Sequence, residues 1–381
     1  MLTPAESLRQ LGADGLLRQQ NPLDSPTGVQ VTQNGRRLWN FASNDYLGLA
    51  RHPEIEAAFI EGVQRFGAGA AASRLVCGTL PPHRLLENEL AAAKQTEAAL
   101  TFTSGFATAL GAIPAIVEKS DFVFIDKLSH ACLVDAARLS GATLRVFPHN
   151  DLKKLERLLV STREKFSSAQ ILIVTESVFS MDGDLCPLRE IITLAETYDA
   201  LLLLDEAHAF GVLGENGMGL AEQENLQKRI TFQMGTLSKA AGLAGGYLAA
   251  SQDWIDLLTN RARSFIYSTA PPPALAHAAT ASLKLIRSAE GKKLRAQLQC
   301  NIAKLSPCQT PIIPKILGSN EAALNASRDL DESGFLVPAI RFPTVPRGTA
   351  RLRISLSAAH SPEAIDALAE FLSRNHGNKS T

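Results

Sequence analysis

A lysine and an aspartate lie in two segments that together could bind an aldehyde cofactor. Lys239 lies in the segment 236–242, TLSKAAG, and Asp205 ends the apolar run 201–205, LLLLD. The run predicts a buried strand of a parallel sheet, with Asp205 at its carboxyl end, where open α/β sheets bind ligands. A carboxylate there keeps the pyridinium nitrogen of pyridoxal phosphate (PLP) protonated, and a lysine in a small-residue turn binds that cofactor covalently. The pair therefore predicts a lysine bound to PLP.

Each of these residues has a simpler explanation when it is taken alone. A single lysine is usually a solvated charge, and a single aspartate at a strand end is often a helix cap. The letters DEAH at 205–208 also match a nucleotide-binding motif of helicases, which need a second, glycine-rich motif, GxxxxGK[ST]. The one Gly-Lys pair, at 291–292, has Ile286 in place of the first glycine and Lys293 in place of the hydroxyl residue. The helicase interpretation is therefore excluded.

Length and composition favour a globular protein of two domains. The chain has 381 residues, of which 45% are hydrophobic, enough for a large core. Lysine plus arginine equals aspartate plus glutamate, at 38 each, so no global field attracts nucleic acid or an anionic membrane. The N-terminus lacks a basic region followed by an apolar stretch, and no run approaches the roughly 20 apolar residues of a membrane span. We therefore expect a cytoplasmic protein without nucleic-acid or membrane partners.

The five cysteines predict neither a disulfide nor a metal site. They stand at positions 77, 132, 186, 300 and 308, with no CxxC or other metal-like spacing. In a reducing compartment this odd number of cysteines indicates free thiols, and we expect no zinc.

Short apolar runs alternate with helical patterns over the middle of the chain. The expected strands are 100–103, 122–125, 143–147, 171–175, 201–205, 230–234 and 246–250. This alternation predicts the α/β class, with a mainly parallel seven-stranded sheet and helices on both faces.

The pattern changes after residue 260, which indicates a smaller α+β domain. The later elements are a long helical stretch, two strands and a closing helix, at about 273–298, 337–341, 351–355 and 362–373. The polar first forty residues predict a helix and a hairpin, with QNGR at 33–36 as its turn signal. The expected parts are an N-terminal segment packing on the small domain, a large PLP-binding domain and a C-terminal small domain, at 1–45, 46–282 and 283–381.

Ordered motifs over nearly the whole chain share one resemblance. They are SNDYLGL at 43–49, DKLSHA at 126–131, VFSMDGD at 178–184 and PTVPRGTARLR at 343–353, on either side of Asp205 and Lys239. Together they resemble the α-oxoamine synthases, PLP enzymes of fold type I that join an amino acid to an acyl thioester with loss of CO2. The resemblance implies that fold for this chain.

The sequence most resembles the branch of this family that uses L-alanine. The resemblance implies an acyltransferase of biotin synthesis that condenses L-alanine with pimeloyl-CoA or a pimeloyl carrier protein. A glycine-using member of the family, a fold type I aminotransferase and a noncatalytic subunit of a heterodimer are the alternatives. The segment 343–353 argues against the first, the thioester-family motifs argue against the second, and the presence of Lys239 argues against the third.

The resemblance also implies roles around the cofactor ring. His130 lies flat over the ring, and Asp205 pairs with the ring nitrogen. His208 reaches the phenolic oxygen, which needs a hydrogen-bond donor. Lys239 binds the cofactor and then takes the α-proton of the substrate.

Further residues are expected to hold the rest of the cofactor. The Ser104-Gly105-Phe106 turn follows a strand and opens a helix, so its backbone amides face an anion such as the phosphate. By resemblance, Ser180 and Thr236 form hydrogen bonds with the cofactor. Thr269, in the segment YST, reaches the phosphate of the neighbouring subunit, which implies a homodimer with shared active sites.

The amino acid substrate needs a group that fixes its carboxylate, and a bidentate arginine does this best. Arg353 matches the second arginine of the family's RLR motif, and Arg351, on the same side of the strand, is a possible substitute. By resemblance, Arg18, Asn44 and Thr344 also lie on the substrate side.

Three departures from the family pattern leave every catalytic group in place. The segment 67–74, GAGAAASR, has fewer glycines than relatives commonly carry, which puts the acyl-chain preference in doubt. Cys132 stands where relatives often have serine, and Thr108 replaces a frequent asparagine. The last two changes are expected to alter the ring contacts slightly.

Overall fold

The computed structural model describes residues 2–374, which form two compact units. The small unit contains the chain up to Gly48, the segment Met181–Gly183 and the residues from Gln297 onward. The large unit contains Leu49–Ser180 and Asp184–Ala296. Within the described residues, no helix is both long and apolar enough to cross a membrane.

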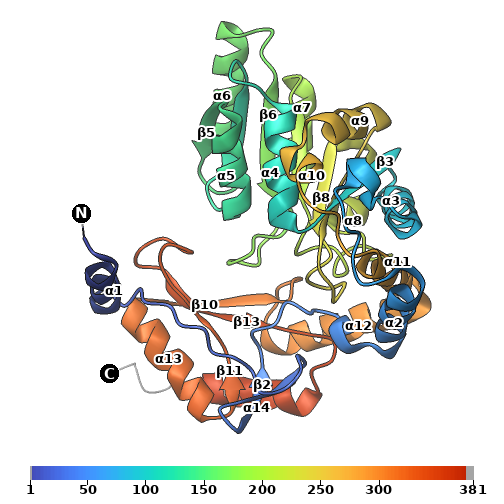
Figure 1. Cartoon of the computed structure of the whole chain (residues 1–381). Coiled ribbons are helices and arrows are strands. Elements are labelled where there is room, and N and C mark those ends of the chain that lie inside the picture. The colour runs from blue at the N-terminus through green and yellow to red at the C-terminus, as the bar shows by residue number, and fades with distance from the viewer. Residues whose placement is uncertain (1, 375–381) are drawn as a thin grey trace. The chain divides into compact units, whose positions relative to one another are not determined.

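A seven-stranded sheet forms the centre of the large unit (Figure 1). In spatial order its strands are β3 (Ala98–Phe102), β9 (Gly246–Ala250), β8 (Phe232–Thr236), β7 (Leu201–Asp205), β6 (Ile171–Glu176), β4 (Phe122–Asp126) and β5 (Thr143–Phe147). Strand β9 runs antiparallel to both of its neighbours, and the other pairs are parallel. The expected mainly parallel seven-stranded sheet is confirmed.

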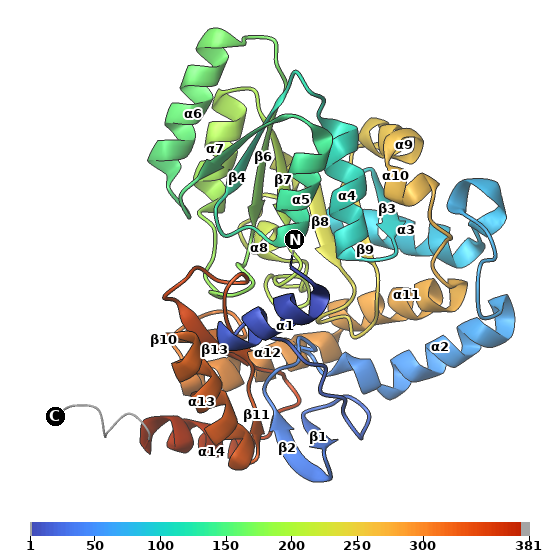
Figure 2. The same ribbon diagram turned by 60° about the vertical axis from the view of Figure 1, so that its left-hand side comes forward.

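The central strands are apolar because they are buried on both faces. Successive side chains of a strand point to opposite faces. Leu172 and Leu203 pack in one core with α4 (Gly105–Ile116), α5 (Ala131–Ser140) and α9 (Gln252–Arg261). In Figure 2, α4 and α5 lie in front of the sheet. The alternate residues, such as Ile173 and Leu204, are equally buried.

Other helices complete the large unit. Its α-helices include α2 (Pro53–Phe66), α3 (Pro81–Lys94), α6 (Leu152–Lys165), α7 (Leu188–Thr197), α8 (Leu220–Gln223), α10 (Arg263–Ile266) and α11 (Pro273–Arg287). Short turns of other helix types are at Leu49–Arg51, Arg74–Gly78 and Gln227–Arg229. Helix α11 packs against α2 and α3, so the domain boundary expected near residue 283 falls inside a helix of this unit.

The single helical stretch expected at 273–298 is wrong, because it is two helices. Helix α11 ends at Arg287, and α12 (Ala289–Leu305) begins two residues later. Ser288 between them is extended, with ψ 175°, and its hydroxyl accepts the backbone N–H groups of Glu290 and Gly291 at 3.2 and 3.3 Å. Serine is a favoured cap at a helix N-terminus, and here it separates the end of α11 from the start of α12.

Within residues 2–374, the small unit contains two three-stranded sheets, three whole helices and the part of α12 from Gln297 to Leu305. The hairpin of β1 (Gln30–Gln33) and β2 (Arg36–Asn40) turns at Asn34 and Gly35, whose φ angles of 51° and 72° are those of the turn that Asn-Gly favours. Strand β2 also pairs with β11 (Phe335–Leu336). The second sheet has the order β10 (Ile312–Gly318), β13 (Ala350–Ser355), β12 (Ala339–Ile340), and the helices are α1 (Pro4–Ala13), α13 (Asn320–Glu332) and α14 (Pro362–Arg374).

Candidate active site

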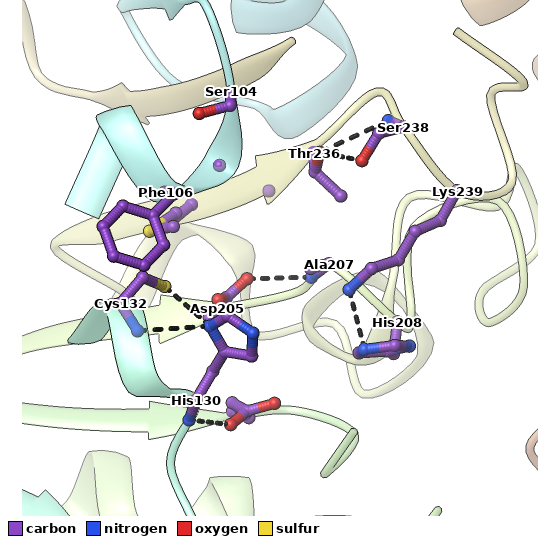
Figure 3. A pocket seen from close by; sticks show the side chains of 14 residues that line it. Ser104, Phe106, His130, Cys132, Asp205, Ala207, His208, Thr236, Ser238 and Lys239 are labelled. Carbon is purple, nitrogen blue, oxygen red and sulfur yellow. Dashed lines mark hydrogen bonds between the residues drawn. The ribbon is translucent and has the colours of Figure 1, made fainter. Parts of the chain in front are cut away.

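A cavity of about 230 Å³ lies in the large unit, at the carboxyl ends of parallel strands (Figure 3). Its wall consists of Ser104, Gly105, Phe106, His130, Cys132, Glu176, Asp205, Ala207, His208, Met234, Gly235, Thr236, Ser238 and Lys239. These residues include all four of the predicted catalytic residues and eight of the ten predicted for the cofactor. The parallel strands therefore gather at one edge the side chains that the sequence distributes over more than a hundred positions.

Asp205 is the last residue of β7 and is 5% exposed. Its Oδ1 accepts the backbone N–H of Ala207 at 2.9 Å, which fixes the carboxyl group at the strand end. Burial raises the pKa of Asp205, and the positive charge of Lys239 acts in the opposite direction. A cation placed beside this carboxyl group would stabilise its ionised form.

Lys239 and His208 meet in the same cavity. The Nζ atom of Lys239 lies 2.7 Å from Nε2 of His208, whose side chain is buried (Figure 3). Lys239 follows β8 in a turn that closes at Gly242, where φ is 71° and an added Cβ would lie 2.4 Å from the backbone nitrogen of Ala50. Only glycine fits such a position without strain, so the small-residue turn fixes where the lysine emerges.

The N-terminus of α4 forms another part of the cavity wall. Ser104 caps the helix, since its hydroxyl accepts the backbone N–H of Ala107 at 3.0 Å. A Cβ at Gly246 would lie 2.6 Å from the nitrogen of Gly105, so a glycine on β9 lets the first turn of α4 approach the sheet closely. A helix N-terminus presents free amide groups and a partial positive charge, which suit a phosphate.

His130 is the N-cap of α5 and is held on two sides. Its backbone N–H donates to Oε1 of Glu176 at 2.5 Å, and its Nδ1 accepts the backbone N–H of Cys132 at 3.3 Å. The surrounding protein lowers the pKa of His130 by removing water, while the charge of Asp205 raises it. The side chain itself is exposed where it lines the cavity. The ring is thus fixed at its helix end and accessible from the cavity.

Glu176 is a cavity residue that the sequence analysis missed. It ends β6 directly beside Asp205 in the sheet and is 2% exposed. Burial and the neighbouring charge of Asp205 raise the pKa of Glu176 to about 8. A charged residue at the end of an otherwise apolar strand was the available signal, the same signal that identified Asp205.

Two predicted cofactor residues are absent from the cavity wall within residues 2–374. Ser180 is buried, and its backbone N–H donates a hydrogen bond to Glu176. Thr269 is exposed and lies in a β-bridge with Ser73. The role expected for Thr269 in a neighbouring subunit stays a prediction.

The small unit brings together two of the predicted substrate residues, Asn44 and Arg353. Arg353 is 4% exposed, and its Nη1 donates to Oδ1 of Asn44 at 3.0 Å and to Oγ of Ser355 at 2.7 Å. The buried hydroxyl of Tyr46 donates to the same Oδ1 at 3.1 Å and lies 3.4 Å from Nη2 of Arg353. Asn44, Tyr46 and Ser355 thus hold the guanidinium in one orientation, and the last two were not predicted.

Arg351, the possible substitute for Arg353, is ion-paired within the small unit. Its Nη1 lies 2.6 Å from Oδ1 of Asp182 and donates to the carbonyl of Met181 at 3.0 Å. The other two predicted substrate residues, Arg18 and Thr344, are exposed and joined by a hydrogen bond of 3.1 Å.

The groups of the cavity fit PLP. Asp205 offers a carboxyl group for the ring nitrogen, Lys239 an amine for the aldehyde, and the start of α4 an anion site for the phosphate. His130 offers an aromatic face and His208 a ring nitrogen beside the amine. An acid, an amine and an anion site in one cavity are the groups that PLP requires.

Comparison with known proteins extends this description. The family model for aminotransferase class I and II matches residues 36–372. The 8-amino-7-oxononanoate synthase of Geobacter sulfurreducens is 46% identical over 381 residues, covering 97% of either chain. A solved 8-amino-7-oxononanoate synthase from Francisella tularensis has a TM-score of 0.76 and 28% identity, covering 89% of this chain and 97% of that one. A variant of serine palmitoyltransferase from S. paucimobilis, with bound PLP–myriocin aldimine, has a TM-score of 0.91 and 27% identity, covering 97% and 96%.

Proposed function

This chain belongs to the 8-amino-7-oxononanoate synthases, which are fold type I PLP enzymes with acyltransferase activity, and we propose that it condenses L-alanine with a pimeloyl thioester. The acyl donor is pimeloyl-CoA or a pimeloyl carrier protein. The products are 8-amino-7-oxononanoate, CO2 and the free thiol, as a step of biotin biosynthesis. The observation that carries the proposal is the cavity in which Lys239, His208 and Asp205 meet at the ends of parallel strands.

The large unit would hold the cofactor. When bound, PLP supplies an electron sink that stabilises negative charge on the α-carbon of the amino acid. Asp205 would keep the ring nitrogen protonated, and His208 would donate to the phenolic oxygen. The start of α4, with Ser104, Gly105 and Phe106, binds the phosphate. Thr236, in the cavity wall, would add a hydrogen bond to the cofactor, and the cofactor contact expected of Ser180, which lies outside that wall, stays a prediction.

Lys239 would bind the cofactor and then move the proton of the substrate α-carbon. A neutral amine is needed for this step. Nε2 of His208 lies 2.7 Å from Nζ, so a hydrogen bond to this ring can hold the amine in place within the cavity. His130, whose ring lines the cavity, would limit the movement of the cofactor ring and so help to keep the substrate in one orientation.

The small unit would hold the substrate carboxylate through Arg353. Arg351 is the weaker candidate because Asp182 already neutralises its charge. We assign Asn44, Arg18 and Thr344 to the substrate side. We also propose a homodimer in which Thr269 reaches the cofactor phosphate of the partner subunit, and the cytoplasmic location expected from the sequence stays a prediction.

The test measures thiol release from pimeloyl-CoA by the purified protein loaded with PLP. L-alanine and glycine are compared as amino acid substrates, and a pimeloyl carrier protein is assayed in parallel as the acyl donor. We expect release that depends on L-alanine and is abolished in Lys239→Ala. The matched control is Lys228→Ala, which removes an exposed lysine outside the cavity.

The outcomes separate the alternatives. Release with glycine alone would assign the chain to a glycine-using α-oxoamine synthase and contradict the proposal. Release only from the carrier protein would keep the reaction and identify the donor. Cofactor binding without release from either donor would indicate a noncatalytic subunit.

A further inference from the structure

The thiol of Cys132 contacts the imidazole that lines the cofactor cavity. Its Sγ lies 3.0 Å from Nδ1 of His130, and the cysteine is 3% exposed (Figure 3). Burial raises the pKa of the Cys132 thiol, so the sulfur keeps its proton and acts as a donor. A buried, protonated thiol is a poor nucleophile, but at this distance it can donate a hydrogen bond to the imidazole.

The two donors from Cys132 determine which nitrogen of His130 carries the proton. The backbone N–H of Cys132 donates to Nδ1 at 3.3 Å, and through this bond the His130 side chain caps α5. The thiol of Cys132 lies 3.0 Å from the same nitrogen. A neutral imidazole has one acceptor nitrogen and one donor nitrogen. Because Nδ1 accepts, the proton is on Nε2. The environment also lowers the pKa of His130, which favours the neutral ring.

We propose that Cys132 is a positioning residue that holds His130 as the Nε2–H tautomer in one ring orientation at the cavity wall. The backbone of His130 is held separately, by the hydrogen bond from its N–H to Glu176. The thiol therefore fixes the side-chain torsion angles of His130, and so the orientation of its ring. This inference rests on the proposed function, because an ordered ring matters for the affinity of PLP.

The tautomer is measured directly by 15N NMR of histidine-labelled protein without cofactor. His130→Ala identifies the signals of His130 among the eight histidines. We expect the Nε2–H pattern in the wild type and in Cys132→Ser, whose hydroxyl is a donor of similar size. Cys132→Ala loses the thiol at 3.0 Å and keeps only the longer backbone contact of 3.3 Å, so it should give a mixture of tautomers. An unchanged Nε2–H pattern in Cys132→Ala would overturn the role of the thiol. An Nδ1–H pattern in the wild type would overturn the proposal.

The consequence for the cofactor is measured by its dissociation constant and absorption spectrum. Loss of one hydrogen bond in Cys132→Ala should raise the PLP dissociation constant about three- to tenfold, and Cys132→Ser should restore it. The matched control is Cys186→Ala, which removes another buried thiol that lies outside the cavity wall.

A double-mutant cycle distinguishes positioning from a general packing role. If Cys132 acts through the ring, Cys132→Ala should add nothing to the change in affinity caused by His130→Ala. An equal loss of affinity in both backgrounds would overturn the proposal. A wild-type protein that bound no PLP would contradict the proposed function instead, while the NMR result would still decide the tautomer.

Discussion

The cofactor cavity of the large unit and the Arg353 cluster of the small unit use polar groups in different ways. The cavity gathers ionisable groups that shift each other's protonation. Burial and the charge of Asp205 raise the pKa of Glu176, and burial also raises the pKa of Asp205, while the charge of Lys239 opposes that rise. In the cluster, the neutral oxygens of Asn44 and Ser355 accept hydrogen bonds from one guanidinium. The cavity therefore controls the charge and protonation of its groups, whereas the cluster fixes the orientation of the Arg353 guanidinium.

The difference predicts which kinetic constants each region controls. Substitutions in the cavity should alter the chemical step and the affinity for PLP. Substitutions in the cluster should alter the affinity for the amino acid. A cavity variant that changed only the affinity for the amino acid, or a cluster variant that changed the affinity for PLP, would contradict the comparison.

The largest effect is expected for Asp205→Asn. The amide oxygen still accepts the N–H of Ala207, so the geometry is kept while the charge at the cofactor nitrogen is lost. We expect kcat to fall about 10²–10³-fold. Steady-state kinetics at full cofactor occupancy, monitored by absorbance, measures the effect. A wild-type kcat would show that this charge does not serve the reaction.

An intermediate effect is expected for Arg353→Lys, with Arg351→Lys as its control on the same strand. Loss of a bidentate, charge-assisted contact should raise the KM for L-alanine about ten- to a hundredfold, with PLP affinity unchanged. Arg351→Lys should lower the thermal midpoint, because it disturbs the pair with Asp182, and leave this KM unchanged. The reverse pattern would assign the carboxylate to Arg351.

The smallest effect is expected at His149, a charged group of the large unit that lies outside the cavity wall. Burial opposes its charge, but hydrogen bonds from its ring to Asp126 and Asp184, at 3.1 and 2.7 Å, raise the pKa of His149 to about 10. With the imidazole about a quarter exposed, His149→Gln should cost about 1–2 kcal/mol of stability.

The pH dependence of this cost follows from the direction of the shift. The reference pKa of 6.5 is raised on folding, so the stabilisation is complete below pH 6.5 and is lost as the pH rises through about 10. Urea unfolding of wild type and variant at several pH values between these limits measures it. A difference in the free energy of unfolding that grew with pH would contradict the raised pKa. A changed kcat of His149→Gln at neutral pH would show that His149 also affects the reaction in the cavity.

The sequence predicted the sheet well because buried parallel strands are nearly pure apolar runs. The expected strands at 143–147, 201–205 and 246–250 coincide with β5, β7 and β9. Asp205, at the end of such a run, was therefore located in advance. The break at Ser288 was not, because its hydroxyl acts as a cap only in one backbone conformation.

Other residues of the two sites were missed, or their role was predicted to be too small, because it depends on tertiary contacts. They are Glu176, Cys132 and Tyr46. Glu176 ends an apolar strand and faces Asp205 only through the sheet register. Cys132 was interpreted as a slight change in ring contacts, and its distance of 3.0 Å from His130 depends on how α5 begins. Tyr46 and Arg353 are brought together from opposite ends of the chain.

The sequence by itself determined the order of the strands along the chain, the turn that carries Lys239 and the residue types available for chemistry. These depend on local propensity and on apolar periodicity, which neighbouring residues define. Tertiary structure alone decided which side chains meet, which carboxyl groups lose water and which nitrogen of His130 accepts a hydrogen bond. Those properties depend on distances of a few ångströms between distant segments, and only the packed sheet and helices fix such distances.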